Sequence, residues 1–312
     1  MSSPIVTPNL KSRLAGAIYG HLVGDAMGVP YEFLEPAAIK EVVFGAAGTH
    51  GQPPGTWSDD GALMLALLDS LLSVGFEPAD QAARILSWYR EGAYAPGGLV
   101  FDVGNTTIRA IQHVSDGVAA IDAGPSDERT ISNGSLMRIL PIALVGRDLP
   151  APELIRQARL ASRVTHGHII PQMVCALYVW TARELLRGES SLRAVPEAHT
   201  DLTEVLRAQD DEEALVALEG VWNYSGPFHG SGRAEDAFWS AYDAFVSTYS
   251  YTECLDAAIG RYGHDTDTTA AIAGGLAGIY YGLGAIPDEW LERLRGGEIV
   301  GPLVERLVAS AT

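Results

Sequence analysis

The distribution of apolar positions predicts an almost entirely helical chain. Most segments place apolar residues three and four positions apart or are apolar throughout, and they lack the regular alternation of strands. We expect helices at 13–28, 61–72, 79–89, 105–113, 153–164, 169–186, 202–207, 212–221, 234–248, 254–261 and 268–283. These elements indicate a mainly α protein of one domain.

The first and the last of these helices carry glycine at every fourth position. The glycines are Gly16, Gly20, Gly24 and Gly28 in the first helix, and Gly274, Gly278 and Gly282 in the last. Residues four apart lie on one face of a helix, and a face without side chains lets another backbone come very close. The sequence therefore predicts that these two helices can pack against each other at short distance.

The segments between the helices are richer in glycine, proline and polar residues. Residues 36–55, 92–104 and 116–133 are predicted to be connecting loops. An apolar run at 136–145 is interrupted by Pro141.

Charge and hydropathy disfavour two classes of protein. The chain has 39 acidic residues against 21 basic ones, and its formal net charge of −18 opposes binding to a nucleic-acid backbone except through local basic patches or bound cations. The apolar stretch 14–30 contains His21 and Asp25 and falls short of the roughly 20 apolar residues that a membrane-spanning helix needs. We expect neither nucleic-acid binding nor membrane insertion.

Cysteine usage and the start of the chain point to a reducing compartment. Cys175 and Cys254 lie in apolar, helix-like segments, so neither a disulfide framework nor a cysteine-based zinc site is predicted. Residues 1–10 lack the basic-then-apolar pattern of a secretory signal. We therefore expect a soluble cytoplasmic protein.

Two acidic motifs stand immediately before helices that look buried. They are Ser58-Asp59-Asp60 and Asp265-x-Asp267-Thr268. Helix capping is one explanation, because Ser, Thr and Asp are favoured caps and first-turn carboxylates gain about 0.3–1 kcal/mol from the helix dipole. Capping needs one acceptor at each helix end, however, whereas these motifs together supply four carboxylates and two hydroxyls.

A second explanation for the acidic motifs is a metal site. If the two helices are neighbours, four like charges converge in a poorly hydrated place and must be protonated or paired with cations. The nearby sequence offers no equal supply of Lys or Arg, so divalent cations are the simplest partners for the carboxylate charges. Oxygen ligands favour Mg²⁺ or Mn²⁺ over Zn²⁺, and so many carboxylates suit two ions.

Six short motifs follow one another along the chain: Gly24-Asp25-Ala26-Met27-Gly28, Trp57-Ser58-Asp59-Asp60, Asp102-Val103-Gly104-Asn105-Thr106-Thr107, Ser132-Asn133-Gly134-Ser135-Leu136-Met137-Arg138, Thr165-His166-Gly167-His168 and Gly263-His264-Asp265-Thr266-Asp267-Thr268. In this order they resemble the ADP-ribosylglycohydrolase family, which includes dinitrogenase-reductase-activating glycohydrolase and the ADP-ribosyl-arginine and ADP-ribosyl-serine hydrolases. The resemblance implies an all-α, compact orthogonal multi-helix bundle in a single domain over 1–312. Its core would span about 13–283, followed by a C-terminal extension at 284–312.

The resemblance also implies a binuclear Mg²⁺ or Mn²⁺ site. The implied metal ligands are Ser58, Asp59, Asp60, Asp265, Asp267 and Thr268. Ser58 replaces the usual threonine and retains its oxygen. Two positions depart further from the family pattern, since Gly61 stands in place of a threonine and His264 in place of a frequent Gly or Asp. No role is predicted for His264.

Glu32 and Asp102 are the candidate catalytic acid and base. Glu32 follows a tight turn and is flanked by aromatic residues, where desolvation would raise its pKa. By resemblance it lies near the metals and acts on water or on the departing group, and Asp102 is a second candidate. The alternatives are an ordinary loop carboxylate for Glu32 and an N-cap of the helix near Asn105 for Asp102.

A further group of residues is predicted to contact the ligand. Asn133-Gly134-Ser135 is a turn sequence whose backbone N–H groups can face an anion. The resemblance places this turn, with Asn105 and His166, near the phosphates and ribose of the ligand. Arg138 could bind phosphate or make a structural salt bridge, and His168 is expected to be structural because zinc would need further ligands.

These features lead to the hypothesis of a metal-dependent hydrolase that cleaves the glycosidic bond between ADP-ribose and an acceptor. The acceptor would be a protein side chain, with arginine slightly favoured over serine, and the partner an ADP-ribosylated protein or a small ADP-ribose conjugate bound by a monomer. Two alternatives stay open. One is a non-catalytic ADP-ribose-binding relative, and the other is a metal phosphohydrolase acting on a nucleotide, because oxygen-only two-metal sites also serve that chemistry.

Overall fold

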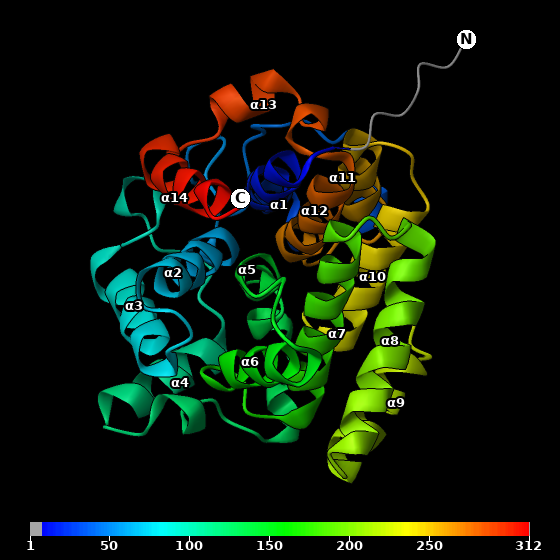
Figure 1. Ribbon diagram of the computed structural model, residues 1–312. Coiled ribbons are helices and arrows are strands. Elements are labelled where there is room, and N and C mark those ends of the chain that lie inside the picture. Colours follow the sequence, from blue (N-terminus) through cyan, green and yellow to red (C-terminus); the bar gives the residue numbers. More distant parts are fainter. Residues whose placement is uncertain (1–7, 312) are drawn as a thin grey trace.

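Residues 8–311 of the computed structural model form an all-helical protein, as the apolar pattern predicted (Figure 1). This range contains fourteen α-helices joined by loops and short 3₁₀ turns, and no strand. None of these helices is long and apolar enough to cross a membrane. The expectation that residues 1–10 hold no secretory signal falls largely outside the described range.

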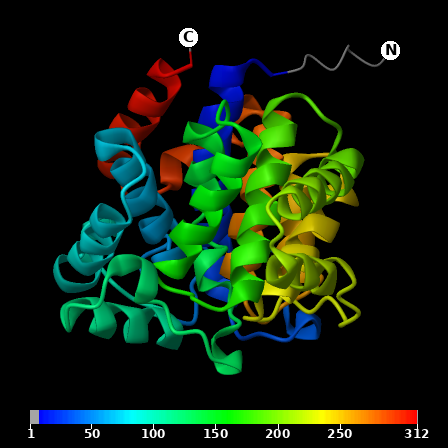
Figure 2. The same ribbon diagram turned by 60° about the horizontal axis from the view of Figure 1, so that its bottom comes forward.

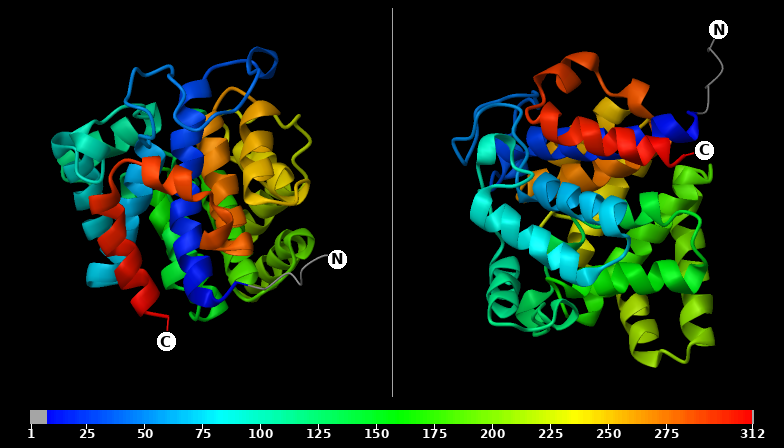
Figure 3. Two further views of the ribbon diagram at one scale, coloured as in Figure 1. Left: turned by 90° about the horizontal axis from the view of Figure 1, so that it is seen from above. Right: turned by 60° about the vertical axis from the view of Figure 1, so that its left-hand side comes forward.

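The two glycine-bearing helices form the centre of the bundle. Helices α1 (Leu10–Gly28) and α12 (Thr266–Tyr281) lie side by side, blue and orange in Figure 3. A Cβ atom added to Gly24 would lie 2.2 Å from the carbonyl oxygen of Ala270, and one added to Gly278 would meet a carbonyl oxygen at 1.9 Å. The predicted close packing is confirmed, because only glycine leaves room for the facing backbone.

Helix α2 (Asp59–Val74) packs beside this pair. Its residues from Asp59 to Leu68 are all buried, which fits the apolar character of the segment. Helix α14 (Gly297–Ala309) lies beside α1 and α2 and buries Val300 and Leu307 against them (Figure 3). The C-terminal residues therefore help to enclose α2.

The remaining helices surround this core. Helix α7 packs against α6, α8 and α9 (Figure 2), and α10 and α11 pack against α12. Their bounds are α3 Pro78–Glu91, α4 Asn105–Ser115, α5 Leu140–Val145, α6 Ala151–Arg163, α7 Ile169–Leu186, α8 Ser191–Ala208, α9 Glu212–Trp222, α10 Ala234–Val246, α11 Tyr251–Gly260 and α13 Asp288–Arg293. Both cysteines are free and buried, as expected from their apolar segments.

Two local predictions need correction. Helix α8 begins at Ser191 and not near residue 202, although it contains Pro196. The proline ring lies on the exposed face, where water can satisfy the carbonyl that loses its N–H partner. Pro141 does not interrupt an apolar run but stands in the first turn of α5, where its missing N–H is not needed.

The connection from 29 to 58 brings side chains back toward the ends of α1 and α12. It contains only short 3₁₀ turns, as its glycine and proline content predicted. The Tyr31 hydroxyl accepts a hydrogen bond from the Val43 N–H at 2.7 Å, and the Thr49 hydroxyl donates to the Glu32 carbonyl at 3.0 Å. These bonds fold the loop over the segment that carries Glu32.

Candidate metal centre and catalytic cavity

The start of α2 is held from beneath by Asp25. The Ser58 hydroxyl caps the helix by accepting from the Asp60 N–H at 3.2 Å. The Asp25 carboxylate, buried within α1, accepts from the N–H groups of Ser58 and Gly61 at 2.9 and 2.7 Å. The N–H groups of this first turn therefore have partners without Asp59. Sequence reasoning missed this role of Asp25, although a carboxylate inside an apolar helix could have indicated it.

The start of α12 is fastened in a different way. The Thr266 hydroxyl donates to the Gly28 carbonyl at 2.8 Å, which ties α12 to the end of α1. Asp265 is the N-cap residue but makes no capping hydrogen bond, and its carboxylate accepts from the Asn133 side-chain amide at 2.8 Å. Capping therefore explains Ser58 and does not explain the carboxylate of Asp265.

The two acidic motifs meet where these helices begin. The Thr268 hydroxyl donates to Asp60 Oδ2 at 3.3 Å, and the Ser58 hydroxyl lies 3.4 Å from the same oxygen. The other Asp60 oxygen, Oδ1, and Asp267 Oδ2 are buried without a hydrogen-bond partner in the described part of the chain. Buried carboxylate oxygens without partners are costly, and hard divalent cations bind such oxygens, so the residues fit a metal site.

The electrostatics of the cluster support the same view. Burial raises the pKa of Asp59, Asp60 and Asp267 well above its usual range. The charges of neighbouring carboxylates, among them Asp25 and Asp265, push the pKa of Asp60 in the same direction. Without a cation these groups would hold protons, whereas a bound cation would let them ionise.

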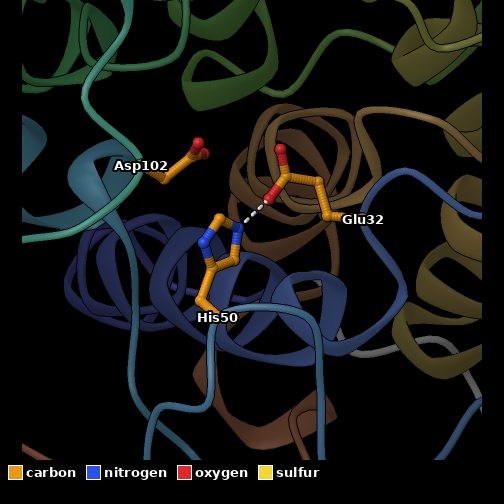
Figure 4. Close-up of side chains that lie close together, drawn as sticks. All are labelled: Glu32, His50 and Asp102. Atoms are coloured by element: carbon orange, nitrogen blue, oxygen red, sulfur yellow. Dashed lines mark hydrogen bonds and ion pairs between the residues drawn. The ribbon is translucent and has the colours of Figure 1, made fainter.

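Glu32, His50 and Asp102 form a second group beside the acidic motifs (Figure 4). His50 Nε2 lies 2.5 Å from Glu32 Oε2, and one potential ligand atom from each of the three residues lies within 4.8 Å of the others. The three side chains come from separate loops and point toward one another (Figure 4). His50 was missed by sequence reasoning because it stands in a glycine-rich loop without a motif around it.

The two candidate acids have perturbed pKa values. Burial, followed by the negative charges of Asp102 and Asp265, raises the pKa of Glu32 to about 9. Burial also raises the pKa of Asp102, with Asp265 adding to the effect and His50 opposing it. The capping alternative for Asp102 is not supported, since Gly104 is the N-cap of α4 and no side chain caps this helix.

A cavity of about 320 Å³ connects most of the predicted site residues. It is lined by Glu32, Asp59, Asp60, Asp102, Asn105, Asn133, Gly134, His166, Asp265 and Thr268, together with Arg129 and others. Three predicted residues do not line it. Ser58 and Asp267 are buried outside its lining, and the Ser135 hydroxyl is turned into the core, where it accepts from the Ser162 hydroxyl at 2.9 Å.

A further wall of the cavity is built by the turn that begins at Asn133, whose side-chain amide contacts Asp265 of the acidic cluster. The Asn133 N–H donates to the Gly232 carbonyl at 3.0 Å. A Cβ at Gly134 would lie 2.8 Å from the His166 ring, so glycine lets the ring lie against the turn. Burial lowers the pKa of His166 to about 3, which keeps the imidazole neutral, and its Nε2 lies 2.9 Å from the Ser132 hydroxyl.

Two nearby polar residues are structural. The buried Arg138 guanidinium donates to the Ala161 carbonyl and the Thr165 hydroxyl, each at 2.8 Å, so neither a phosphate ligand nor a salt bridge describes it. His168 caps α7 by accepting from the Ile170 N–H, which confirms its structural assignment.

The two positions that depart from the family pattern have structural explanations. A Cβ at Gly61 would lie 2.6 Å from a Leu22 methyl group and 2.8 Å from the Trp57 ring, so a threonine would not fit without repacking. His264 has a φ of 56°, and its backbone pairs with the loop after Glu32: its carbonyl accepts from the Phe33 N–H at 2.6 Å. The chain at His264 therefore links the Glu32 loop to the metal motif.

Comparison with known proteins finds similar chains over nearly the whole length of this one. A model of the family described as ADP-ribosylglycohydrolase matches residues 6–312. The ADP-ribosylarginine hydrolase Tri1 of Pseudomonas putida is 28% identical over 301 residues, covering 95% of this chain and 77% of that protein. The ADP-ribosyl-dinitrogen-reductase glycohydrolase of Rhodospirillum rubrum is 29% identical, covering 92% of each chain. A solved structure of an ADP-ribosylglycohydrolase-related protein complex is 34% identical, with a TM-score of 0.79 over 97% of this chain and 99% of that chain.

Proposed function

Because the chain belongs to the ADP-ribosylglycohydrolase family, we propose that it hydrolyses the glycosidic bond between ADP-ribose and a protein side chain, with arginine favoured over serine. One observation carries the proposal: the starts of α2 and α12 converge and leave buried carboxylate oxygens without partners. They lie beside a cavity that also contains two carboxylates of raised pKa. Perturbed acids in a cavity next to oxygen ligands are typical of hydrolytic sites.

The metal requirement is part of the proposal. Two divalent cations, Mg²⁺ or Mn²⁺, would be held by Ser58, Asp59, Asp60, Asp265, Asp267 and Thr268. Bound there, they would supply positive charge that orients the proximal ribose and stabilises charge developing at the reacting centre. Asp25 and Asn133 would keep the ligands in place, because outer partners of this kind fix the orientation of ligating carboxylates.

Glu32 is proposed to carry the proton between water and the departing group. Its carboxyl lines the cavity, and its raised pKa places a proton there at neutral pH in the absence of cations. Cations near it would lower that pKa toward the working range of a general base. Asp102 would act through its charge on Glu32, and His50 would position the Glu32 carboxyl.

The wall at the Asn133 turn is proposed to hold the ADP part of the ligand. Arg129 offers a positive charge and the Gly134 N–H offers a donor to the diphosphate, while the Asn133 N–H is bonded to the Gly232 carbonyl. Asn105 and the neutral His166 line the same cavity, where Asn105 can hydrogen-bond the ribose hydroxyls and the His166 ring can contact the ligand. The acidic cluster and this wall of the cavity would together enclose the proximal ribose.

The test is to incubate the purified protein with Mg²⁺ or Mn²⁺ and ADP-ribosyl-arginine, ADP-ribosyl-serine or O-acetyl-ADP-ribose. We expect release of ADP-ribose that EDTA abolishes. Binding of ADP-ribose by calorimetry without turnover of any conjugate would favour a non-catalytic relative. Release of phosphate in place of ADP-ribose would favour a nucleotide phosphohydrolase.

A further inference from the structure

A second cavity, of about 460 Å³, adjoins the catalytic cavity. The two share Phe33, Gly232 and Asp265 as lining residues, so the second cavity begins where the acidic cluster ends. Its other lining residues are Glu35, His229, Ser231 and His264. None of these four was assigned a catalytic, ligand-binding or metal-binding role by the sequence.

The walls of the second cavity are held by hydrogen bonds of their backbone N–H groups, and these bonds do not use the side chains of Phe33 and Glu35. The Phe33 N–H donates to the His264 carbonyl at 2.6 Å, and the His264 N–H donates to the Leu34 carbonyl at 2.9 Å. On the other wall, the buried Asp236 carboxylate accepts from the N–H groups of His229 and Ser231 at 2.9 and 3.0 Å. Both walls are therefore fixed close to the metal motif.

The side chains of this cavity suit a planar cation. The Phe33 residue is 65% exposed, and the Glu35 side chain is 75% exposed. Within residues 8–311 no Lys or Arg lies within 4.0 Å of the Glu35 carboxylate, and its near neighbour is His264 Nε2 at 3.7 Å. An aromatic face beside an available carboxylate attracts a guanidinium, which can stack on the ring while it hydrogen-bonds the carboxylate.

The two cavities differ in what they offer to an anion: among the described residues, the catalytic cavity has Arg129 beside its carboxylates, whereas the second cavity is lined by no Lys or Arg. In the catalytic cavity, Arg129 and the Gly134 N–H suit a diphosphate. The second cavity contains Glu35, which would repel a diphosphate, and no Lys or Arg. An ADP-ribosylated arginine has the same polarity, with an anionic diphosphate at one end and a cationic guanidinium at the other.

We infer that the second cavity is the acceptor subsite and that Glu35 and Phe33 select ADP-ribosyl-arginine by binding its guanidinium. This inference rests on the proposed function, since it assigns the acceptor end of the same substrate. A serine conjugate is neutral at the acceptor and gains little from either side chain. The ratio of kcat/KM for the arginine conjugate to kcat/KM for the serine conjugate therefore measures the subsite directly.

The experiment measures this ratio in wild type, Glu35→Gln and the matched control Glu41→Gln. Glu41 is exposed on the same loop and lines neither cavity. We expect the ratio to fall about five-fold in Glu35→Gln, the upper value for an exposed ion pair, and to stay unchanged in Glu41→Gln. Adding Phe33→Ala to Glu35→Gln is expected to lower the ratio on the order of 20-fold, because the cation–π contribution is similar in size.

The outcomes separate the subsite from the proposed function. Release of ADP-ribose with an unchanged ratio in both Glu35 variants would overturn the acceptor subsite and leave the hydrolase standing. An equal fall in the control would also overturn it, because the effect would then be one of general charge. Failure of wild type to release ADP-ribose from either conjugate would remove the proposed function, and the subsite with it.

Discussion

Replacing Gly24 by alanine should test how the α1–α12 contact builds the metal centre. The added Cβ would lie 2.2 Å from the Ala270 carbonyl oxygen, about 1.2 Å closer than the 3.4 Å of an ordinary contact. One atom is the added Cβ and the other is a backbone oxygen. No side-chain rotation can relieve this clash, so the two helices must separate. Overpacking of this kind costs about 1–3 kcal/mol, and we take the upper value because backbone must move.

Helix propensity works against this loss. Alanine is about 1 kcal/mol more favourable than glycine inside a helix, so the net destabilisation of Gly24→Ala is about 2 kcal/mol. Because α12 begins close to this contact, the separation should also move Asp267 and Thr268 away from Asp60 and weaken cation binding.

The assay is urea unfolding at fixed pH with and without Mg²⁺, with Gly220→Ala as the control. Gly220 is exposed in α9, and a Cβ there would meet nothing within 4 Å, so this control should be stabilised by up to about 1 kcal/mol. A Gly24→Ala protein at least as stable as wild type, with undiminished Mg²⁺ stabilisation, would show that the close α1–α12 contact does not support the metal centre.

Two further predictions concern the proton-carrying group and the response to pH. Glu32→Gln should lower kcat by about 100-fold or more, as expected for loss of a general acid or base, and Asp102→Asn by much less. His50→Ala should lower kcat, whereas His50→Gln should keep much of the wild-type kcat because it retains a donor near Glu32. Equal losses of kcat in both variants would contradict a positioning role. In EDTA, the free energy of unfolding should fall as pH rises above about 4. Burial raises the folded-state pKa of Asp25 to about 7 and of Glu32 to about 9. Above about pH 4 the folded protein therefore binds more protons than the unfolded chain, and it loses that advantage as the pH rises. Saturating Mg²⁺ should flatten that decline, and urea midpoints at pH 6 and pH 8 that are equal in EDTA would contradict the prediction.

The sequence predicted the centre of the fold because the relevant signals are local and periodic. Glycine every fourth residue marks a helix face, and its meaning does not depend on the rest of the chain. The start of α8 was missed because a proline usually ends a helix. Only the tertiary structure shows that Pro196 lies on the exposed side, where a helix tolerates it. Local signals thus identify elements better than their ends.

Some residues of the candidate site could likewise be predicted from local motifs, whereas others could not. Motifs next to helix starts identified Asp60 and Asp267, because capping alone could not use so many carboxylates. His50 and Glu35 could not be found from sequence, since each becomes significant only when another loop is placed beside it. The packing explanation for Gly61 likewise depends on where the Trp57 ring lies.

The proposed function depends on the starts of α2 and α12 forming a site for two divalent cations. The most direct measurement is calorimetric titration of EDTA-treated protein with Mn²⁺, in wild type, in Asp60→Asn and in Asp256→Asn, a control exposed on α11. We predict two ions bound per chain in wild type and in the control. Asp60→Asn should weaken binding by more than about 100-fold, since loss of an outer partner alone costs about 10–100-fold. Absence of Mn²⁺ binding in wild type, or equal binding in Asp60→Asn, would show that these helix starts are not the cation site.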